Sequence, residues 1–271
     1  MRPGPLPDER HGARGGTRVA LTREVSPAIG RCELTHLPRV PIDAELARAQ
    51  HGKYEAALAA LGCTVVRLAP EPDLPDAVFV EDTAIVLPEI AVLTRPGAAS
   101  RRPETASTAA ALAAHRPLAS IEEPGTLDGG DVLRLGTRLW VGASGRSNAP
   151  GIEQLRALLI PFGYEVKAVP FTGCLHLKSA ATAVAPDLIL VNPAWVDPAR
   201  FDGASFLETD PAEPHAANAL LVGEAVVYPV SFPRTRARLE ASGIAVTTVD
   251  LSELQKAEGA VTCCSLVFEA G

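Results

Sequence analysis

Short β-strands and helices recur in one fixed order along the chain of 271 residues. The repeating unit is two strands joined by a tight turn, then a helix, then a third strand, with Gly, Pro, Asp or Asn at the boundaries. A strand near the C-terminus and a strand–helix–strand run near the N-terminus supply the parts of one further unit, shared by the two ends of the chain. The other units are expected at residues 83–122, 132–169, 182–208 and 219–249.

Five such units predict a closed α/β ring, because closure lets each unit bury its apolar face on a neighbour and leaves few free strand edges. An open α/β sheet is the alternative. Helices are expected at 44–61, 104–115, 151–162 and 233–242, and the helix of the unit at 182–208 has a weak pattern. Residues 1–16 lack the apolar segment of a secretory signal and are expected to be a disordered extension, followed by a single domain at 17–271.

Charge and cysteine content restrict the partners and the compartment. The net charge of −7 argues against nucleic acid or an anionic membrane surface as a partner, and no apolar run is long enough to span a bilayer. The five cysteines are irregularly spaced and include no Cys-x-x-Cys pair, which favours a reducing compartment. We therefore expect a cytoplasmic monomer or homodimer that acts on a small molecule.

A polar cluster lies at or just before the start of each unit. In a closed ring, equivalent positions face the same axis at the same end, so clusters that are distant in sequence are expected to converge on one pocket. The clusters are PDAVFVED (75–82), LDGGD (127–131), GCLHLKS (173–179), EPHAAN (213–218) and EGAVTCC (258–264).

These clusters contain the groups needed for nucleophilic catalysis. Cys263 and His176 are a candidate thiolate and general acid/base, and Asp128 is placed to orient the imidazole. The carboxylates of Glu81 and Asp82 disfavour a thiolate unless the substrate itself brings positive charge. A guanidinium does so, and carboxylates bind its planar fork.

Two arginines suggest the other end of the substrate. Arg101 and Arg146 each follow the second strand of their unit and are expected on one rim, where they would hold a carboxylate. A cation at one end and a carboxylate at the other describe an arginine-like amino acid. Taken singly, each residue has a plainer interpretation: a cysteine is more often a core residue, and adjacent arginines are more often solvated. Cys264, the next residue on a predicted strand, is expected to face the core.

Seven segments together resemble the dimethylarginine dimethylaminohydrolase family of the guanidine-modifying superfamily. They occur in order between residues 74 and 266: LPDAVFVEDTA, TRPGAASRR, TLDGGDVL, VGASGRSN, LHLKSA, EPHAAN and EGAVTCCSL. The resemblance implies a five-bladed α/β propeller, the pentein fold. It also implies hydrolysis of Nω-methylated arginines to citrulline and methylamine or dimethylamine, through a thiouronium intermediate and without a metal or organic cofactor.

The resemblance further implies a role for each matching residue. Cys263 would be the nucleophile, His176 the general acid/base and Asp128 the acid that partners it. The implied substrate contacts are Glu81 and Asp82 to the guanidinium, Asp76 to the α-amino group, Arg101 and Arg146 to the α-carboxylate, and Leu34 in a flap over the ligand. The flap segment 31–41 departs most from the family, and Ser147 stands where the family commonly has threonine.

Other interpretations stay open from the sequence. The substrate could be another guanidine, such as Nω-hydroxyarginine or arginine. A non-catalytic arginine-binding module would keep the pocket without turnover. A structural zinc protein using Cys263, Cys264 and His176 has poor geometry, because adjacent residues on a strand point apart. Zinc could still bind Cys263 and His176 opportunistically and inhibit the enzyme.

Overall fold

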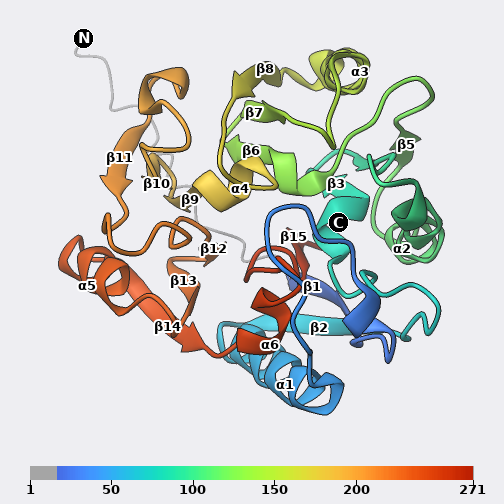
Figure 1. Cartoon of the computed structure of the whole chain (residues 1–271). Coiled ribbons are helices and arrows are strands. Elements are labelled where there is room, and N and C mark those ends of the chain that lie inside the picture. The colour runs from blue at the N-terminus through green and yellow to red at the C-terminus, as the bar shows by residue number, and fades with distance from the viewer. Residues whose placement is uncertain (1–16, 271) are drawn as a thin grey trace, which may run out of the picture.

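The structure, a computed structural model, describes residues 17–270, so the extension expected at 1–16 lies outside it. Five three-stranded sheets surround a central axis, and the predicted closed ring is confirmed (Figure 1). The blades, in ring order, are β15–β1–β2 (Leu266–Glu269, Arg18–Arg23, Cys63–Leu68), β3–β4–β5 (Ala84–Val86, Ala91–Leu93, Leu118–Ser120), β6–β7–β8 (Val132–Leu135, Arg138–Ala143, Glu165–Pro170), β9–β10–β11 (Ala181–Ala185, Leu188–Val191, Ser205–Glu208) and β12–β13–β14 (Leu220–Val222, Ala225–Pro229, Ala245–Val249).

Every blade pairs its first two strands antiparallel and its last two in parallel. In the first blade the antiparallel pair joins the two ends of the chain, with Leu21 opposite Leu266. This pairing closes the ring between the first and the last strand, as the shared fifth unit predicted.

The helices that join the second and third strands lie on the outside of the ring (Figure 1). They are α1 (Ala44–Ala60), α2 (Thr105–Leu112), α3 (Ala149–Leu159) and α5 (Pro233–Ala241). The blade with the weak helix pattern has only a 3-10 turn, Pro198–Arg200, at this place. None of the described helices is long and apolar enough to cross a membrane.

Apolar clusters fill the interfaces between neighbouring blades. Val19 and Phe268 of the first blade pack in one cluster with Ala91 and Leu112 of the next. Trp140, one of the largest fully buried side chains, joins the third blade to the fourth. Each large apolar side chain buried in this way contributes about 1.5–3 kcal/mol. Because each blade covers its apolar face with its neighbours, the ring as a whole is the stable unit.

The segments that precede the first strand of each blade (β15, β3, β6, β9 and β12) gather at one end of the axis. They include two 3-10 turns, η2 (Val80–Thr83) and η4 (Gly129–Asp131), and two short helices, α4 (Leu177–Ala180) and α6 (Ser252–Gln255), which the sequence did not predict. The loop from β1 to α1, blue in Figure 1, crosses over this end. Strand β15 begins at Leu266, so Cys263 and Cys264 lie in a turn before it. The prediction that Cys264 lies on a strand was therefore wrong.

Candidate active site

A small cavity opens at this end of the axis, beneath the β1–α1 loop. Its volume of about 20 Å³ leaves room for roughly one water molecule. Three of the five polar clusters line it, whereas LDGGD and EPHAAN do not. The predicted site residues that line it are Asp76, Asp82, Arg101, Arg146, His176 and Cys263.

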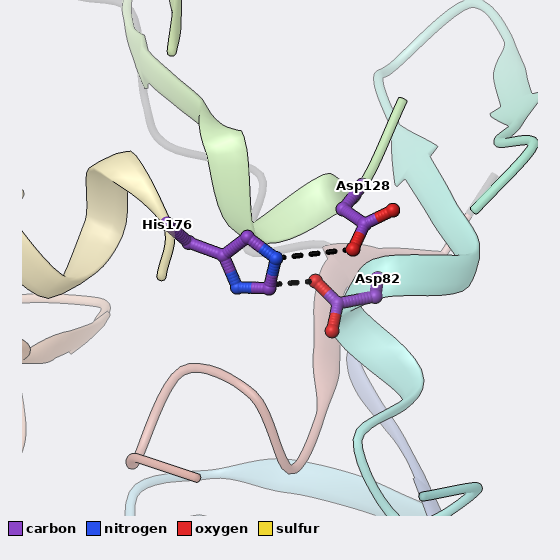
Figure 2. Close-up of side chains that lie close together, drawn as sticks. All are labelled: Asp82, Asp128 and His176. Atoms are coloured by element: carbon purple, nitrogen blue, oxygen red, sulfur yellow. Dashed lines mark hydrogen bonds and ion pairs between the residues drawn. The ribbon is translucent and has the colours of Figure 1, made fainter. Parts of the chain in front are cut away.

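The imidazole of His176 is buried and lies against two carboxylates that come from different blades (Figure 2). Its Nε2 is 3.0 Å from Asp128 Oδ2, and its Nδ1 is 3.8 Å from Asp82 Oδ1. Burial by itself lowers the pKa of His176, but Asp82 and Asp128 outweigh it and raise the pKa to about 9. His176 is therefore an imidazolium at neutral pH, as a general acid must be.

The LDGGD segment explains how these groups approach so closely. A Cβ at Gly130 would lie 2.6 Å from His176 Nδ1 and 2.8 Å from Asp82 Oδ1, so only glycine leaves room for the pair. The Gly130 N–H also donates to Asp82 Oδ1 at 2.9 Å. Asp131 accepts the N–H of Leu177 at 3.0 Å, which anchors the start of α4 immediately after His176.

Cys263 lies half-buried in the turn before β15 and borders the cavity. Burial raises the pKa of its thiol well above the ordinary value, and the carboxylates of Glu81 and Asp82 raise the pKa further. The thiol is therefore protonated at neutral pH in this structure. Cys264 is fully buried in the apolar cluster beneath α1, so its predicted place in the core is confirmed.

Arg101 lines the cavity, but its guanidinium is already engaged by protein groups. Nη1 is 2.5 Å from Asp82 Oδ2, and Nη2 is 2.8 Å from Glu104 Oε2. The backbone oxygen of Phe79 accepts a further hydrogen bond at 3.1 Å. Burial raises the pKa of Asp82, but His176 and Arg101 outweigh it and lower the pKa to about 2. Asp82 is thus an ionised carboxylate between two cations.

The mouth of the cavity is formed by the β1–α1 loop and the groups that hold it. Asp76 accepts the N–H of Glu33 at 3.0 Å. Arg146 donates to Thr35 Oγ1 at 3.4 Å and lies 3.9 Å from Asp128 Oδ2. The side chain of Leu34, between these two contacts, packs against the apolar cluster beneath α1 and does not line the cavity.

The carboxylate of Glu81 is not brought together with the others. It accepts from Lys178 Nζ at 2.6 Å and from Thr262 Oγ1 at 2.7 Å. It lines a second cavity, of about 350 Å³, between the inner strands. Glu81 and Asp82, which the sequence predicted to bind the guanidinium together, therefore face different cavities. Asp82 borders the cavity that Cys263 lines, and Glu81 borders the second, larger cavity.

Two acidic residues at the cavity were not singled out from the sequence. Glu33 lines it, and so does Glu258, whose Oε1 accepts the N–H groups of Thr35, His36 and Leu37 at 3.0, 2.5 and 2.6 Å. Glu258 has a positive φ of 57°. Both residues belong to segments that the sequence marked, but a carboxylate that binds the backbone of a distant loop has no sequence signature.

Asp82, Asp128 and His176 offer possible metal ligands, since one ligand atom of each lies within 4.8 Å of the others (Figure 2). In this structure the same atoms form the ion pairs described above, so the arrangement is satisfied by protein groups alone. The zinc-protein alternative shares only His176 with this group and otherwise used Cys263 and Cys264. It needed Cys264, which is fully buried in the apolar cluster beneath α1.

Comparisons with known proteins agree with this arrangement. No family model matches the chain. The chain is 42% identical over 254 residues to N(G),N(G)-dimethylarginine dimethylaminohydrolase of Streptomyces coelicolor, covering 92% of this chain and 96% of the relative. It is 35% identical over 221 residues to the protein of the same name from Pseudomonas aeruginosa, covering 81% and 87%. The solved structure of a cysteine-to-serine mutant of the Pseudomonas aeruginosa enzyme, complexed with citrulline, superposes with a TM-score of 0.88 at 31% identity, covering 93% of this chain and 99% of that one.

Proposed function

The chain belongs to the dimethylarginine dimethylaminohydrolase family, and from that premise we propose that it hydrolyses Nω-methylated arginines to citrulline and methylamine or dimethylamine. The observation that carries the proposal is the convergence of Cys263 and His176 on one cavity whose wall holds the ionised Asp82. A thiol, an imidazolium and a carboxylate suit attack on a cationic carbon centre.

The cationic substrate supplies what the free site lacks. A guanidinium beside Asp82 favours the anionic form of Cys263, whose thiol releases its proton to solvent. The sulfur then forms a bond to the guanidinium carbon. His176 donates its proton to the departing amine as the C–N bond breaks, which leaves a thiouronium. Neutral His176, oriented by Asp128, next takes a proton from water, and the hydroxide displaces the sulfur to form citrulline.

The binding groups follow from their contacts. We assign the guanidinium to Asp82, the α-carboxylate to Arg146 and the α-amino group to Asp76. Arg101 would first have to give up Asp82 and Glu104 to reach a carboxylate, so its part is to hold Asp82 ionised. Glu81 would similarly have to leave Lys178 and Thr262, so we place it behind the site.

The small volume of the cavity implies a moving flap. Room for about one water does not admit an arginine, so the β1–α1 loop with Leu34 must open for each substrate. Closure then excludes water from the reacting groups, which strengthens their electrostatic interactions. We further propose that the enzyme works in the cytoplasm, where free thiols stay reduced.

The test is citrulline formation by the wild-type protein from asymmetric dimethylarginine, monomethylarginine, Nω-hydroxyarginine and arginine, compared as kcat/KM. Methylated arginines should give the highest values, and Cys263→Ser should abolish turnover. Cys174→Ser is the matched control, since this half-buried thiol does not line the catalytic cavity. Activity retained in Cys263→Ser would reject the nucleophile, and tight binding without citrulline would favour the arginine-binding module.

A further inference from the structure

Asn218 belongs to the one polar cluster that neither lines the catalytic cavity nor contacts His176, yet all of its amide atoms are engaged. Its side chain is buried. Oδ1 accepts the N–H of Thr262 at 3.1 Å, and Nδ2 donates to Thr262 Oγ1 at 2.9 Å and to the backbone oxygen of Lys178 at 3.0 Å. Asn218 thus bridges two segments that come from different parts of the ring.

The same two segments are joined a second time through Glu81. Thr262 Oγ1 donates to Glu81 Oε2, and Lys178 Nζ donates to Glu81 Oε1. The contacts form a closed circuit that runs from Asn218 to Thr262, Glu81 and Lys178 and back to Asn218. The two bonds made by Thr262 Oγ1 are buried, and hydrogen bonds linked in this way reinforce one another.

Each of the three residues that Asn218 joins in the circuit lies within two residues of a proposed active-site residue. Thr262 directly precedes Cys263, Glu81 directly precedes Asp82, and Lys178 follows His176 by two residues. The circuit therefore ties together the segments that carry the nucleophile, the general acid/base and the guanidinium carboxylate, without touching the reacting atoms.

We propose that Asn218 is a positioning residue that, through this circuit, sets the distance between the sulfur of Cys263 and the imidazole of His176. The inference rests on the proposed function. Attack and proton transfer both need near-contact geometry, and a displacement of about 1 Å costs about 100-fold in rate. Thr262 is the counterpart of Asn218 in the circuit, because it accepts from Asn218 and donates to Glu81.

The experiment is a double-mutant cycle on Asn218→Ala and Thr262→Val. Each single variant should lower kcat about 10- to 100-fold and change KM much less. The double variant should be about as slow as either single variant, since both break the same circuit. Thr262→Ser, which keeps the hydroxyl, should restore most of the kcat that Thr262→Val loses.

Asn192→Ala is the matched control for lost stability. Asn192 is buried too and bonds the backbone of Pro214 and Ala194, outside the circuit. It should lower the melting temperature without lowering kcat. Unchanged kcat in Thr262→Val, or losses that multiply in the double variant, would overturn the proposal; Thr262→Val decides alone if Asn218→Ala does not fold.

A second readout separates this inference from the proposed function. Alkylation of Cys263 by 2-chloroacetamidine needs no turnover, and both single variants should slow it at least about 5-fold. Slowed alkylation in a protein that forms no citrulline would keep the positioning role and reject the function. Normal alkylation and normal kcat in the folded variants would reject the positioning role while the function stands.

Discussion

His176 Nε2 lies 3.0 Å from Asp128 Oδ2, a contact between two buried side chains whose segments begin different blades. The contact fixes which imidazole nitrogen faces the carboxylate, so the Nδ1 edge, 3.8 Å from Asp82, lies toward the guanidinium carboxylate. It also keeps His176 protonated at neutral pH, because Asp128 and Asp82 together outweigh the effect of burial on its pKa.

The first prediction concerns this pair. Asp128→Asn keeps the shape of the side chain but removes one negative charge, so the pKa of His176 should fall and kcat should drop about 100- to 10,000-fold. NMR titration of the imidazole measures the pKa, and citrulline formation measures kcat. An unchanged pKa with lost activity would contradict the electrostatic role of Asp128.

The second prediction is a loss of stability in alkali. The pKa of His176 is about 9 in the folded chain against 6.5 for an ordinary histidine, so the folded state favours the protonated form. The resulting stabilisation, on the order of 3 kcal/mol, is complete below pH 6.5 and disappears as the pH rises through 9. Urea unfolding at pH 6, 7.5 and 9.5 should show the decline, and His176→Gln should flatten it.

The third prediction concerns Gly130, which lies against His176 and Asp82. Gly130→Ala puts a methyl group against His176 Nδ1 and Asp82 Oδ1, so it should destabilise the fold by about 1–3 kcal/mol and lower kcat about 100-fold. Gly52→Ala, in helix α1 with open space around its Cβ, should instead stabilise the protein by about 0.5–1 kcal/mol. Thermal melting and kinetics on both variants decide the matter.

The fourth prediction concerns the reactivity of Cys263. Because burial and the carboxylates raise the pKa of its thiol, neutral iodoacetamide should label it slowly at pH 7.5, and cationic 2-chloroacetamidine should label it faster. Asp82→Asn should speed the neutral reagent and abolish the preference for the cation. Cys174, whose pKa is raised to about 12 chiefly by burial, should react slowly with both. Mass spectrometry of peptides measures each site.

The fifth prediction concerns the flap. The carboxylate of Glu258 accepts three N–H groups of the flap, and hydrogen bonds to a charged group contribute about 1.5–3 kcal/mol each. Glu258→Ala should speed hydrogen exchange at residues 35–37 and raise KM. Glu240→Ala, on the exposed side of α5, is the control and should leave both unchanged. Equal exchange in the two variants would show that Glu258 does not hold the flap.

The strand pattern was predictable because it depends on local sequence. The strands at 132–135 and 188–191 match the structure to the residue, since an Asp before each strand and a Gly or Asn after it mark where pairing stops. Helix α4 was not predictable. It has four residues, too few for an apolar period, and its start is held by Asp131 from another blade.

The sequence by itself determined the five-fold repeat, the closed ring and the end of the axis where Cys263, His176 and Asp128 meet, because equivalent positions in a repeat must face the same way. Only the tertiary structure decided which neighbouring side chain enters the cavity. Asp82 faces His176 there, whereas Glu81 turns to Lys178 and Thr262. The guanidinium of Arg101 likewise forms ion pairs with Asp82 and Glu104. Glu81 finds its partners on segments of two other blades, whereas Arg101 finds both of its partners within its own blade. A buried charge takes whichever partner the completed fold brings within reach.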